Sequence, residues 1–350
     1  MSGPEPVPAS RVRPSPAHYA LGLLRGWWLW GMLALGVTVL VLLGPRAEMG
    51  ELRDVPVVGE DVNGYLRRVE SAVPGIRPGA EKHVAWLDSA TRSPTPLSVV
   101  YLHGFTADRH EVEPLVTRLA QELGANAYFT RLTGHGRDGD AMAEATTTAW
   151  LHDTAEALAV GRAIGDRVLL VGTSTGGTLA TWAVSRRELA ADVAGLVLLS
   201  PNFHPRDRMS RLLLWPWGGV LARLVEGSER CFPTHNELHE RHWTSCHATE
   251  SLLPMMALTE HVRTSELEAI RTPTLVIYVP DDEVVDARET ERAFERLGSG
   301  AKSLFAVEDP GDPDRHVPAG DALSPGTTDL VLERIRAFVA TLPGGASRDY

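Results

Sequence analysis

The sequence has few cysteines and no excess of basic residues. Its 350 residues include two cysteines, Cys231 and Cys246, too few for a disulfide scaffold or a cysteine-rich zinc module. The 45 acidic residues outnumber the 34 basic ones, which gives a formal net charge of −11. A surface of this sign does not attract a phosphate backbone, so we expect no nucleic-acid partner. The apolar fraction of 43% is ordinary for a globular protein. A chain of 350 residues can bury one large core and has room for a small accessory subdomain.

Metal-binding patterns are incomplete. His235 and His239 lie four positions apart, a spacing that lets two imidazoles on one helical face share a metal. No glutamate completes an HExxH pattern there, and Trp and Thr interrupt the segment, which favours a polar surface. The acidic stretch 309–316 contains two prolines and an irregular spacing that fits no calcium cage. We predict no metal and no cofactor.

One long apolar segment lies near the N-terminus. Residues 26–45 contain no charged side chain, and a helix of that length rises about 30 Å, the thickness of a bilayer's hydrocarbon core. Trp27, Trp28 and Trp30 cluster at one end, as aromatic residues do at membrane interfaces. We predict an uncleaved transmembrane anchor. A buried helix and a signal peptide are the alternatives, although the next residues, GPRAEMG, make a poor cleavage site.

The flanks of this segment suggest a topology. Residues 1–25 start with a stretch rich in proline and small polar residues, which predicts a disordered tail, and residues 46–82 are interpreted as a tether and lead-in. Basic residues slightly predominate before the segment, whereas Arg46 and Arg53 after it lie among acids. This bias predicts a cytoplasmic N-terminus and a single-pass protein whose body lies outside the cytoplasm. The sequence does not indicate an oligomeric state.

The body of the chain, residues 83–345, alternates short apolar runs with amphipathic stretches. Continuous runs rich in Val, Leu and Ile suit strands buried on both faces of a parallel sheet. The intervening stretches 111–124, 149–165 and 289–298 have helical patterns, so we predict an α/β domain with a doubly wound, mostly parallel sheet. The apolar runs are 97–105, 126–136, 167–177, 195–201, 273–280 and 302–309.

One interval interrupts this alternation. About seventy residues separate Pro201 from Pro273, and they contain helical patches without a good strand. We interpret residues 203–270, approximately, as an inserted helical cap that shapes a pocket over the strand ends. Both cysteines lie in it, fifteen positions apart. A disulfide across the cap in an oxidising compartment and two free buried thiols are both compatible with the sequence.

The pattern Gly172-Thr173-Ser174-Thr175-Gly176 directly follows an apolar run and precedes a helical stretch. This strand–turn–helix context is the one in which a serine nucleophile is presented on a tight turn, and the small neighbours avoid clashes there. We therefore predict Ser174 as the nucleophile. The alternative is an ordinary glycine-rich turn with an idle serine.

A serine nucleophile requires a base and an acid, expected in the order serine, acid, histidine. His316 follows the last apolar run, and Asp282 follows the run before it, with Val-Val one residue further on. We predict Asp282 and His316 as the partners of Ser174. Asp281 is a close rival and Asp286 a distant one. Asp281 and Asp282 could each be a helix N-cap instead, while His316 could be a surface residue.

The loop His103-Gly104-Phe105 ends the first apolar run. Glycine allows the backbone to approach a ligand closely, and we predict that the amides of Phe105 and Thr175 form an oxyanion hole. His103 is expected to hold this loop structurally. His135, between Gly134 and Gly136, is expected to shape the loop beneath the pocket.

In these motifs the chain resembles the α/β-hydrolase superfamily, and most closely its monoacylglycerol lipase, lysophospholipase and serine aminopeptidase-like group. The matching pieces are HGF (103–105), GHG (134–136), GTSTGG (172–177), DDEVV (281–285) and RHV (315–317). The resemblance implies an eight-stranded sheet, a cap after the sixth strand and no cofactor. One departure is the Thr on each side of Ser174, where that group commonly has His or Met before the serine and Met or Gln after it.

The function expected from these features is hydrolysis of a small-molecule or lipid ester, as by a carboxylesterase or lipase, through an acyl-enzyme on Ser174. A peptidase or thioesterase would use the same residues, because the machinery also attacks amides and thioesters. A protein that binds ligands on this fold without catalysis is a further alternative, which the presence of nucleophile, base and acid disfavours.

Overall fold

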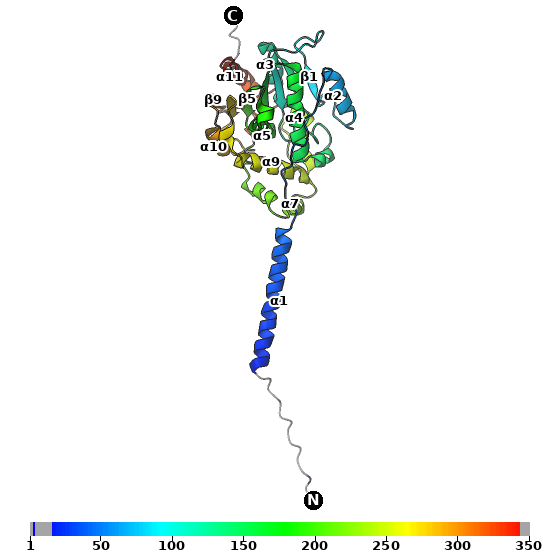
Figure 1. Ribbon diagram of the computed structural model, residues 1–350, viewed down its shortest axis with the longest axis vertical. Helices are drawn as coiled ribbons and strands as arrows, with labels where there is room; N and C mark the ends of the chain where they lie inside the picture. Colours follow the sequence, from blue (N-terminus) through cyan, green and yellow to red (C-terminus); the bar gives the residue numbers. More distant parts are fainter. Residues whose placement is uncertain (1–2, 4–15, 344–350) are drawn as a thin grey trace. The chain divides into compact units, whose positions relative to one another are not determined.

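The computed structural model describes residue 3 and residues 16–343, and for residues 16–26 it describes the backbone alone. The chain divides into two compact units, Met1–Pro45 and Arg46–Tyr350 (Figure 1). In the first unit, helix α1 spans Pro16–Leu42, so the helix begins within the tail predicted for residues 1–25. Proline is favoured in a first helical turn, which accounts for this start. The earlier part of that tail, except Gly3, lies outside the described residues.

Among the described residues, no helix has both the length and the apolar character that crossing a membrane requires. The anchor at residues 26–45 stays a prediction.

The second unit is built on a mostly parallel sheet. Its described residues form seven strands in the spatial order β1-β3-β2-β4-β5-β8-β9. The edge strand β1 runs antiparallel to β3, and all other neighbours are parallel. All six apolar runs of the sequence form strands, which confirms the predicted α/β class. The strands are β1 (His83–Ala85), β2 (Ser98–Leu102), β3 (Asn126–Phe129), β4 (Val168–Thr173), β5 (Val193–Leu199), β8 (Thr274–Tyr278) and β9 (Lys302–Ala306).

The number of strands corrects one expectation. The described part of the chain forms seven strands of this sheet rather than eight, and the cap follows the fifth strand rather than the sixth. Upstream of β1, residues 46–82 contribute helix α2 (Val62–Ser71) and no strand to this sheet. The sequence there is interrupted by charged residues and Pro56, which a central strand does not accommodate. Val62, Tyr65 and Leu66 are buried, so this segment is more than a tether.

Helices cover both faces of the sheet. In β2, Val100 and Leu102 enter one apolar core while Val99 and Tyr101 enter the other, because successive side chains of a strand point to opposite faces. Both cores are fully buried along β2, which is why its sequence reads as a continuous apolar run. The first core packs against α2, α4 (Thr147–Ile164), α5 (Thr175–Ser185) and α10 (Ala287–Arg296), and the second against α3 (Leu115–Leu123) and α11 (Thr328–Ala340) (Figure 1).

The helix predicted for residues 111–124 is divided in the structure. A 3₁₀ helix, η1, covers Arg109–Val112, and α3 begins only at Leu115. Pro114 between them has no backbone N–H to continue a helical hydrogen-bond ladder, so the first helix stops before it. Glu111, the first residue of the predicted helix, lies in η1 and is buried.

The cap lies between β5 and β8. Its C-terminal helix α9 packs its apolar face against the first core, whereas η3 and α7 expose large apolar side chains. Residues of the cap also pair with the main unit: Thr244 N–H donates to Thr106 O at 2.8 Å, and Trp243 forms a bridge with Ala107. The cap elements are η3 (Arg208–Leu214), α7 (Gly218–Glu226), β6 (Glu229–Cys231), α8 (Glu237–His242), β7 (Cys246–Ala248), η4 (Thr249–Ser251), α9 (Leu252–Thr264) and η5 (Leu267–Ala269).

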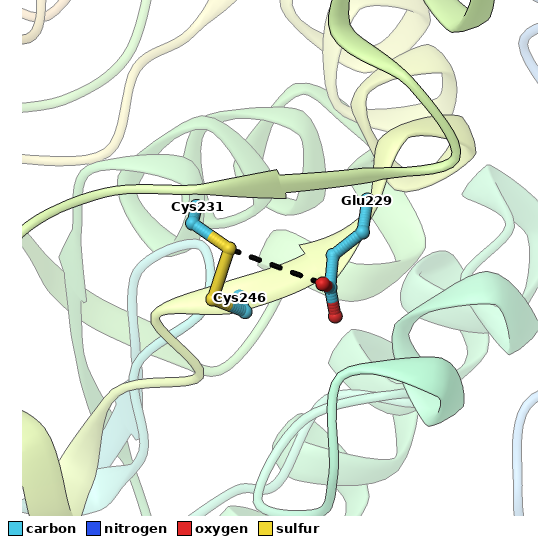
Figure 2. The surroundings of a disulfide bond; sticks show 3 residues. All are labelled: Glu229, Cys231 and Cys246. Atoms are coloured by element: carbon cyan, nitrogen blue, oxygen red, sulfur yellow. Dashed lines mark hydrogen bonds between the residues drawn. A yellow bond between two sulfur atoms is a disulfide. The ribbon is translucent and has the colours of Figure 1, made fainter.

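The cap contains a β-ribbon that corrects the expectation of a purely helical insertion. Strands β6 and β7 pair antiparallel, with Cys231 opposite Cys246, and a disulfide joins these two residues (Figure 2). Each strand is three residues long and polar, too short to show an alternating pattern in the sequence. The structure thus selects the bridged alternative for the cysteines, and it places both on the surface.

Candidate active site

Ser174 lies on the sharp turn between β4 and α5. Its backbone angles, φ 50° and ψ −117°, fall outside the common regions for a residue with a side chain. The turn is held on both sides, because Ser174 N–H donates to Leu199 O at 2.9 Å and Asn202 N–H donates to Ser174 O at 3.0 Å. Ser174 occupies the N-cap position of α5, yet its side chain makes no capping hydrogen bond. Backbone strain of this kind persists at functional sites, and here it presents a hydroxyl that the helix does not use.

Glycines next to Ser174 are required by close backbone approach. A Cβ atom at position 172 would lie 2.5 Å from Gly176 O, and one at position 176 would lie 2.1 Å from Leu102 O. The second contact packs the start of α5 directly against the end of β2. Gly172 and Gly176 therefore bring the turn close to the His103-Gly104-Phe105 loop, as the predicted arrangement needs.

Asp282 and His316 are paired. His316 Nδ1–H donates to Asp282 Oδ2 at 2.7 Å, and both side chains are buried. Asp282 Oδ1 accepts the N–H groups of Val284 and Val285, each at 2.8 Å, so the Val-Val segment fixes the carboxylate. The rival carboxylates lie elsewhere. Asp281 is exposed and faces Arg315, and Asp286 caps α10 by accepting the N–H of Arg288.

Burial opposes the charged form of His316, but the charge of Asp282 and the hydrogen bond to it outweigh burial and raise the pKa of His316 to about 9. The negative charges of Asp312 and Glu111 act in the same direction. Within the described residues, the structure records no direct hydrogen bond between Ser174 and His316. Hydrogen bonds of this kind are often long before substrate binds, and they shorten in the complex.

Asp312 supports the histidine loop and was not predicted from the sequence. Its Oδ2 accepts the N–H groups of His316 at 2.9 Å and Val317 at 2.8 Å, and the residue is buried. A buried carboxylate that accepts two backbone N–H groups fixes the local chain. The spacing D-x-x-x-H in residues 312–316 is the signal that the acidic composition of this stretch obscured.

The predicted oxyanion amides are unoccupied by protein acceptors. In the described part of the chain, neither the N–H of Phe105 nor that of Thr175 has a hydrogen-bond partner. Both are therefore able to donate to a substrate oxygen. The side chain of Phe105 packs edge-on against the rings of His135, Trp150 and His247 at 5.9, 6.2 and 5.2 Å, and this packing restricts the loop.

His103 has the structural role predicted for it. Its Nδ1–H donates to Gly104 O at 2.9 Å, and its Nε2 accepts the N–H of Leu132 at 3.1 Å, which requires the neutral tautomer protonated on Nδ1. Burial lowers the pKa of His103 to about 4, so it stays neutral. His135 is also fully buried, and burial holds its pKa well below the usual range.

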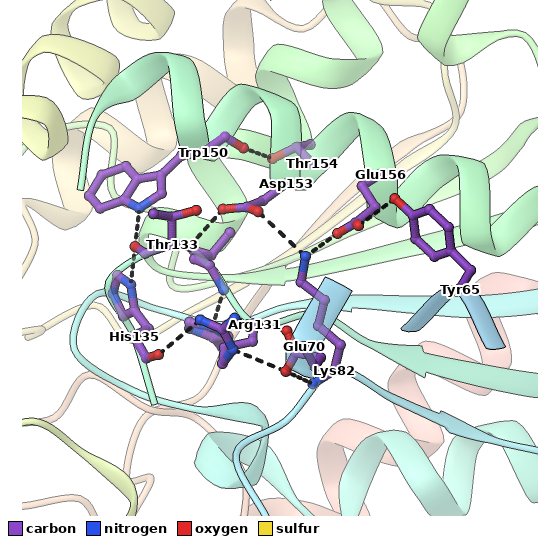
Figure 3. Close-up of polar contacts among 12 residues, drawn as sticks. Tyr65, Glu70, Lys82, Arg131, Thr133, His135, Trp150, Asp153, Thr154 and Glu156 are labelled. Atoms are coloured by element: carbon purple, nitrogen blue, oxygen red, sulfur yellow. Dashed lines mark hydrogen bonds and ion pairs between the residues drawn. The ribbon is translucent and has the colours of Figure 1, made fainter. Parts of the chain in front are cut away.

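A buried polar network supports the loop that carries His135 (Figure 3). Asp153 on α4 accepts the N–H of Thr133 at 2.6 Å, and Trp150 Nε1–H donates to Thr133 O at 2.9 Å. Lys82 lies between the carboxylates of Asp153 and Glu156 and partly offsets their charge. Further pairs, Arg131 with Glu70 and Tyr65 with Glu156, connect the loop and α2 to α4. This network could not be predicted from the sequence, because its members are scattered among helical and strand positions.

Three groups of described residues bring potential metal ligands together, and most of the side chains in them are paired with one another or with the backbone. Cys231 and Cys246 are joined to each other beside Glu229. Asp108 accepts hydrogen bonds from His110 and His242 at 2.8 and 3.2 Å. His235 pairs with Asp314 at 2.8 Å rather than sharing a ligand position with His239, and Asp312 already binds backbone N–H groups.

Comparison with known proteins supports the fold. The family described as serine aminopeptidase, S33, matches residues 94–309, more than half of the chain. The thermostable monoacylglycerol lipase of Bacillus sp. (strain H-257) is 25% identical over 252 residues, covering 71% of this chain and 92% of that protein.

Two solved structures resemble the chain in fold. One belongs to the metagenome-derived lipolytic enzymes LipS and LipT, with 20% identity, a TM-score of 0.59, and coverage of 75% of this chain and 98% of that one. The other is a soluble variant of monoglyceride lipase from Saccharomyces cerevisiae in complex with a substrate analogue. It has 14% identity, a TM-score of 0.52, and coverage of 74% of this chain and 91% of that one.

Proposed function

Because the chain belongs to the serine aminopeptidase S33 family and has the α/β-hydrolase fold, we propose that it is a serine hydrolase that cleaves carboxylic esters through an acyl-enzyme on Ser174. One observation carries this proposal: the buried carboxylate of Asp282 lies 2.7 Å from Nδ1 of His316, on loops that follow neighbouring strands. An imidazole oriented in this way keeps Nε2 available as a base.

In the proposed mechanism, Nε2 of neutral His316 accepts the hydroxyl proton of Ser174 as Oγ attacks the ester carbonyl. Asp282 stabilises the imidazolium that forms. The N–H groups of Phe105 and Thr175 donate to the oxyanion, and donors of this kind contribute about 3 kcal/mol each to the stability of the transition state. The imidazolium then protonates the leaving alcohol, and water activated by the same base hydrolyses the acyl-enzyme.

We propose a lipid-like ester as the substrate class. The similar Bacillus protein is named as a monoacylglycerol lipase, which supports an apolar acyl chain. The cap supports it as well, because η3 and α7 and the segment between them expose several large apolar side chains on the surface. Exposed apolar patches of this kind suit contact with lipid. The exposed apolar side chains of this part of the cap are Met209, Trp215, Val220, Leu221, Leu224 and Val225.

A peptidase is the second candidate, favoured by the description of the matching family as a serine aminopeptidase. Hydrolysis rates on p-nitrophenyl esters of graded chain length and on aminoacyl anilides distinguish the two functions. A preference for esters with longer acyl chains supports the lipase-like proposal, and a preference for anilides supports the peptidase.

The role of Ser174 is tested by labelling with a fluorophosphonate probe, which reacts only with an activated serine. We expect the full chain to be labelled and to hydrolyse p-nitrophenyl esters, and Ser174→Ala to lose labelling and about 10⁶-fold in kcat. Ser185→Ala is the matched control, because its hydroxyl only donates to Trp182 O at the end of α5. Labelling that persists in Ser174→Ala would refute the assignment.

We also propose that residues 26–45 anchor the protein in a membrane with the N-terminus in the cytoplasm and the catalytic unit outside it. The disulfide between Cys231 and Cys246 supports a catalytic unit outside the cytoplasm, since structural disulfides persist in oxidising compartments.

A further inference from the structure

Glu111 is a buried carboxylate that the proposed mechanism does not use. It lies in η1, directly after the loop that carries Phe105, and 2% of its surface is exposed. A carboxylate in this position is costly unless its oxygens are hydrogen-bonded. Burial raises the pKa of Glu111 to about 7, although hydrogen bonds and a nearby positive charge partly offset this.

The partners of Glu111 belong to the proposed oxyanion loop. Its Oε2 accepts the N–H of Gly104 at 2.7 Å and the hydroxyl of Tyr101 at 2.7 Å. A Cβ atom at position 104 would lie 2.5 Å from Oε1 of Glu111, so a side chain there would displace the carboxylate. Gly104 immediately precedes Phe105, whose N–H is a proposed oxyanion donor. The carboxylate thus fixes the peptide on one side of that donor.

The carboxylate of Glu111 is also linked to the turn that carries Ser174 and to His316. The Tyr101 hydroxyl that donates to Glu111 also lies 3.0 Å from Oγ1 of Thr173, the residue before Ser174. The charge of Glu111 raises the pKa of His316, and the charge of His316 lowers that of Glu111. The other charged groups facing this pair are Asp108 for Glu111, and Asp282 and Asp312 for His316.

We infer that Glu111 is a positioning residue of the active site, which holds the His103–Gly104 peptide, next to the Phe105 N–H, for the oxyanion and couples its charge to that of His316. This inference rests on the proposed function, since it assigns Glu111 a part in the same reaction. Glu111 does not touch the reacting atoms. Its effects reach them through the backbone at Gly104 and through the electrostatic field at His316.

Two substitutions separate these effects. Glu111→Gln can keep an oxygen at the position of Oε2 and so retain both hydrogen bonds, but it removes the negative charge. The pKa of His316 then falls, and the acid limb of kcat/KM moves to lower pH. Glu111→Asp keeps the charge but withdraws it from Gly104 N–H, so we expect kcat to fall about tenfold with little change in KM. Its acid limb stays near that of the wild type.

Glu113→Gln is the matched control. It removes a carboxylate two residues away that interacts mainly with Thr117 and Arg109, and whose effect on Tyr101 is the smallest of those acting on that hydroxyl, so both its kcat and its acid limb should match the wild type. If Glu111→Gln does not fold, Tyr101→Phe provides the test. Loss of the hydroxyl raises the pKa of Glu111 further and neutralises it, which should shift the acid limb in the same direction.

The experiment measures kcat, KM and pH profiles of the full-length variants with a p-nitrophenyl ester, alongside melting temperatures and fluorophosphonate labelling. Wild-type activity with unchanged limbs and rates in the Glu111 variants, or in Tyr101→Phe where Glu111→Gln is unfolded, would overturn the inference while leaving the proposed function intact. A lower melting temperature with wild-type kinetics would also overturn it, by making Glu111 structural only. A wild type without labelling or esterase activity would instead reject the proposed function.

Discussion

The charge of Asp282 acts on His316 at short range in a site where both side chains are buried. Burial alone would lower the pKa of His316, and the aspartate reverses this and raises it to about 9. The neutral imidazole is the proposed base, so kcat/KM of the wild type should rise as pH increases through about 9. A pH profile with an ester substrate measures this limb directly.

Asp282→Asn tests the assignment of the acid. The neutral amide cannot stabilise the imidazolium, so we expect kcat to fall about 10⁴-fold. With the charge removed, the pKa of His316 decreases and the acid limb of kcat/KM shifts to lower pH. Asp281→Asn is the control, since that side chain is exposed and does not contact His316. A large loss in Asp281→Asn with little effect of Asp282→Asn would reverse the assignment.

Single site residues can be predicted from the sequence when the groups that fix them are close neighbours in the chain. Asp282 could be selected over its neighbours because the valines after it supply the two N–H groups that fix its carboxylate. Glu111 could not be found in this way. Its partners Tyr101 and Gly104 become neighbours only after β2 and η1 are assembled, and the helix predicted for 111–124 did not distinguish Glu111 from the other polar residues of that stretch.

Among the secondary-structure elements too, those encoded by a local pattern were predicted and those that depend on distant partners were not. Each apolar run formed a strand because both faces of the sheet are covered, which leaves no polar alternation to confuse the pattern. Strands β1, β6 and β7 were not predicted, since each is only three residues long and is stabilised by pairing with a partner distant in the sequence. Helix α2 was missed for a related reason: only three of its ten residues are buried.

The disulfide should stabilise the ribbon of β6 and β7. The two cysteines are fifteen positions apart, and closing a loop of this length contributes about 3 kcal/mol to the free energy of unfolding. We therefore expect the double variant Cys231→Ser/Cys246→Ser to be cleaved faster by protease within the cap and to melt at a lower temperature. The wild type treated with reductant should show the same faster cleavage and lower melting temperature, whereas reductant should not affect the double variant further. Equal protease resistance of the untreated wild type and the double variant would contradict this role.

For the whole molecule, the test concerns the first unit. The second unit contains both apolar cores and every proposed site residue, so removal of residues 1–45 should preserve esterase activity. We expect the full chain to remain with membranes during alkaline carbonate extraction and the shortened chain to be found in the supernatant. A variant lacking only residues 1–15 keeps the apolar segment and should stay with the membranes. Extraction of the full chain by carbonate would contradict the anchor.

The backbone pairing of Thr244 with Thr106, and of Trp243 with Ala107, also limits how the cap works. These contacts join the cap to residues immediately after Phe105, and His247 of β7 rests on the Phe105 ring. A cap that moved as one rigid body at this side would carry the Phe105 N–H with it, away from the Thr175 N–H on α5. Opening at these contacts is therefore incompatible with a complete pair of oxyanion donors.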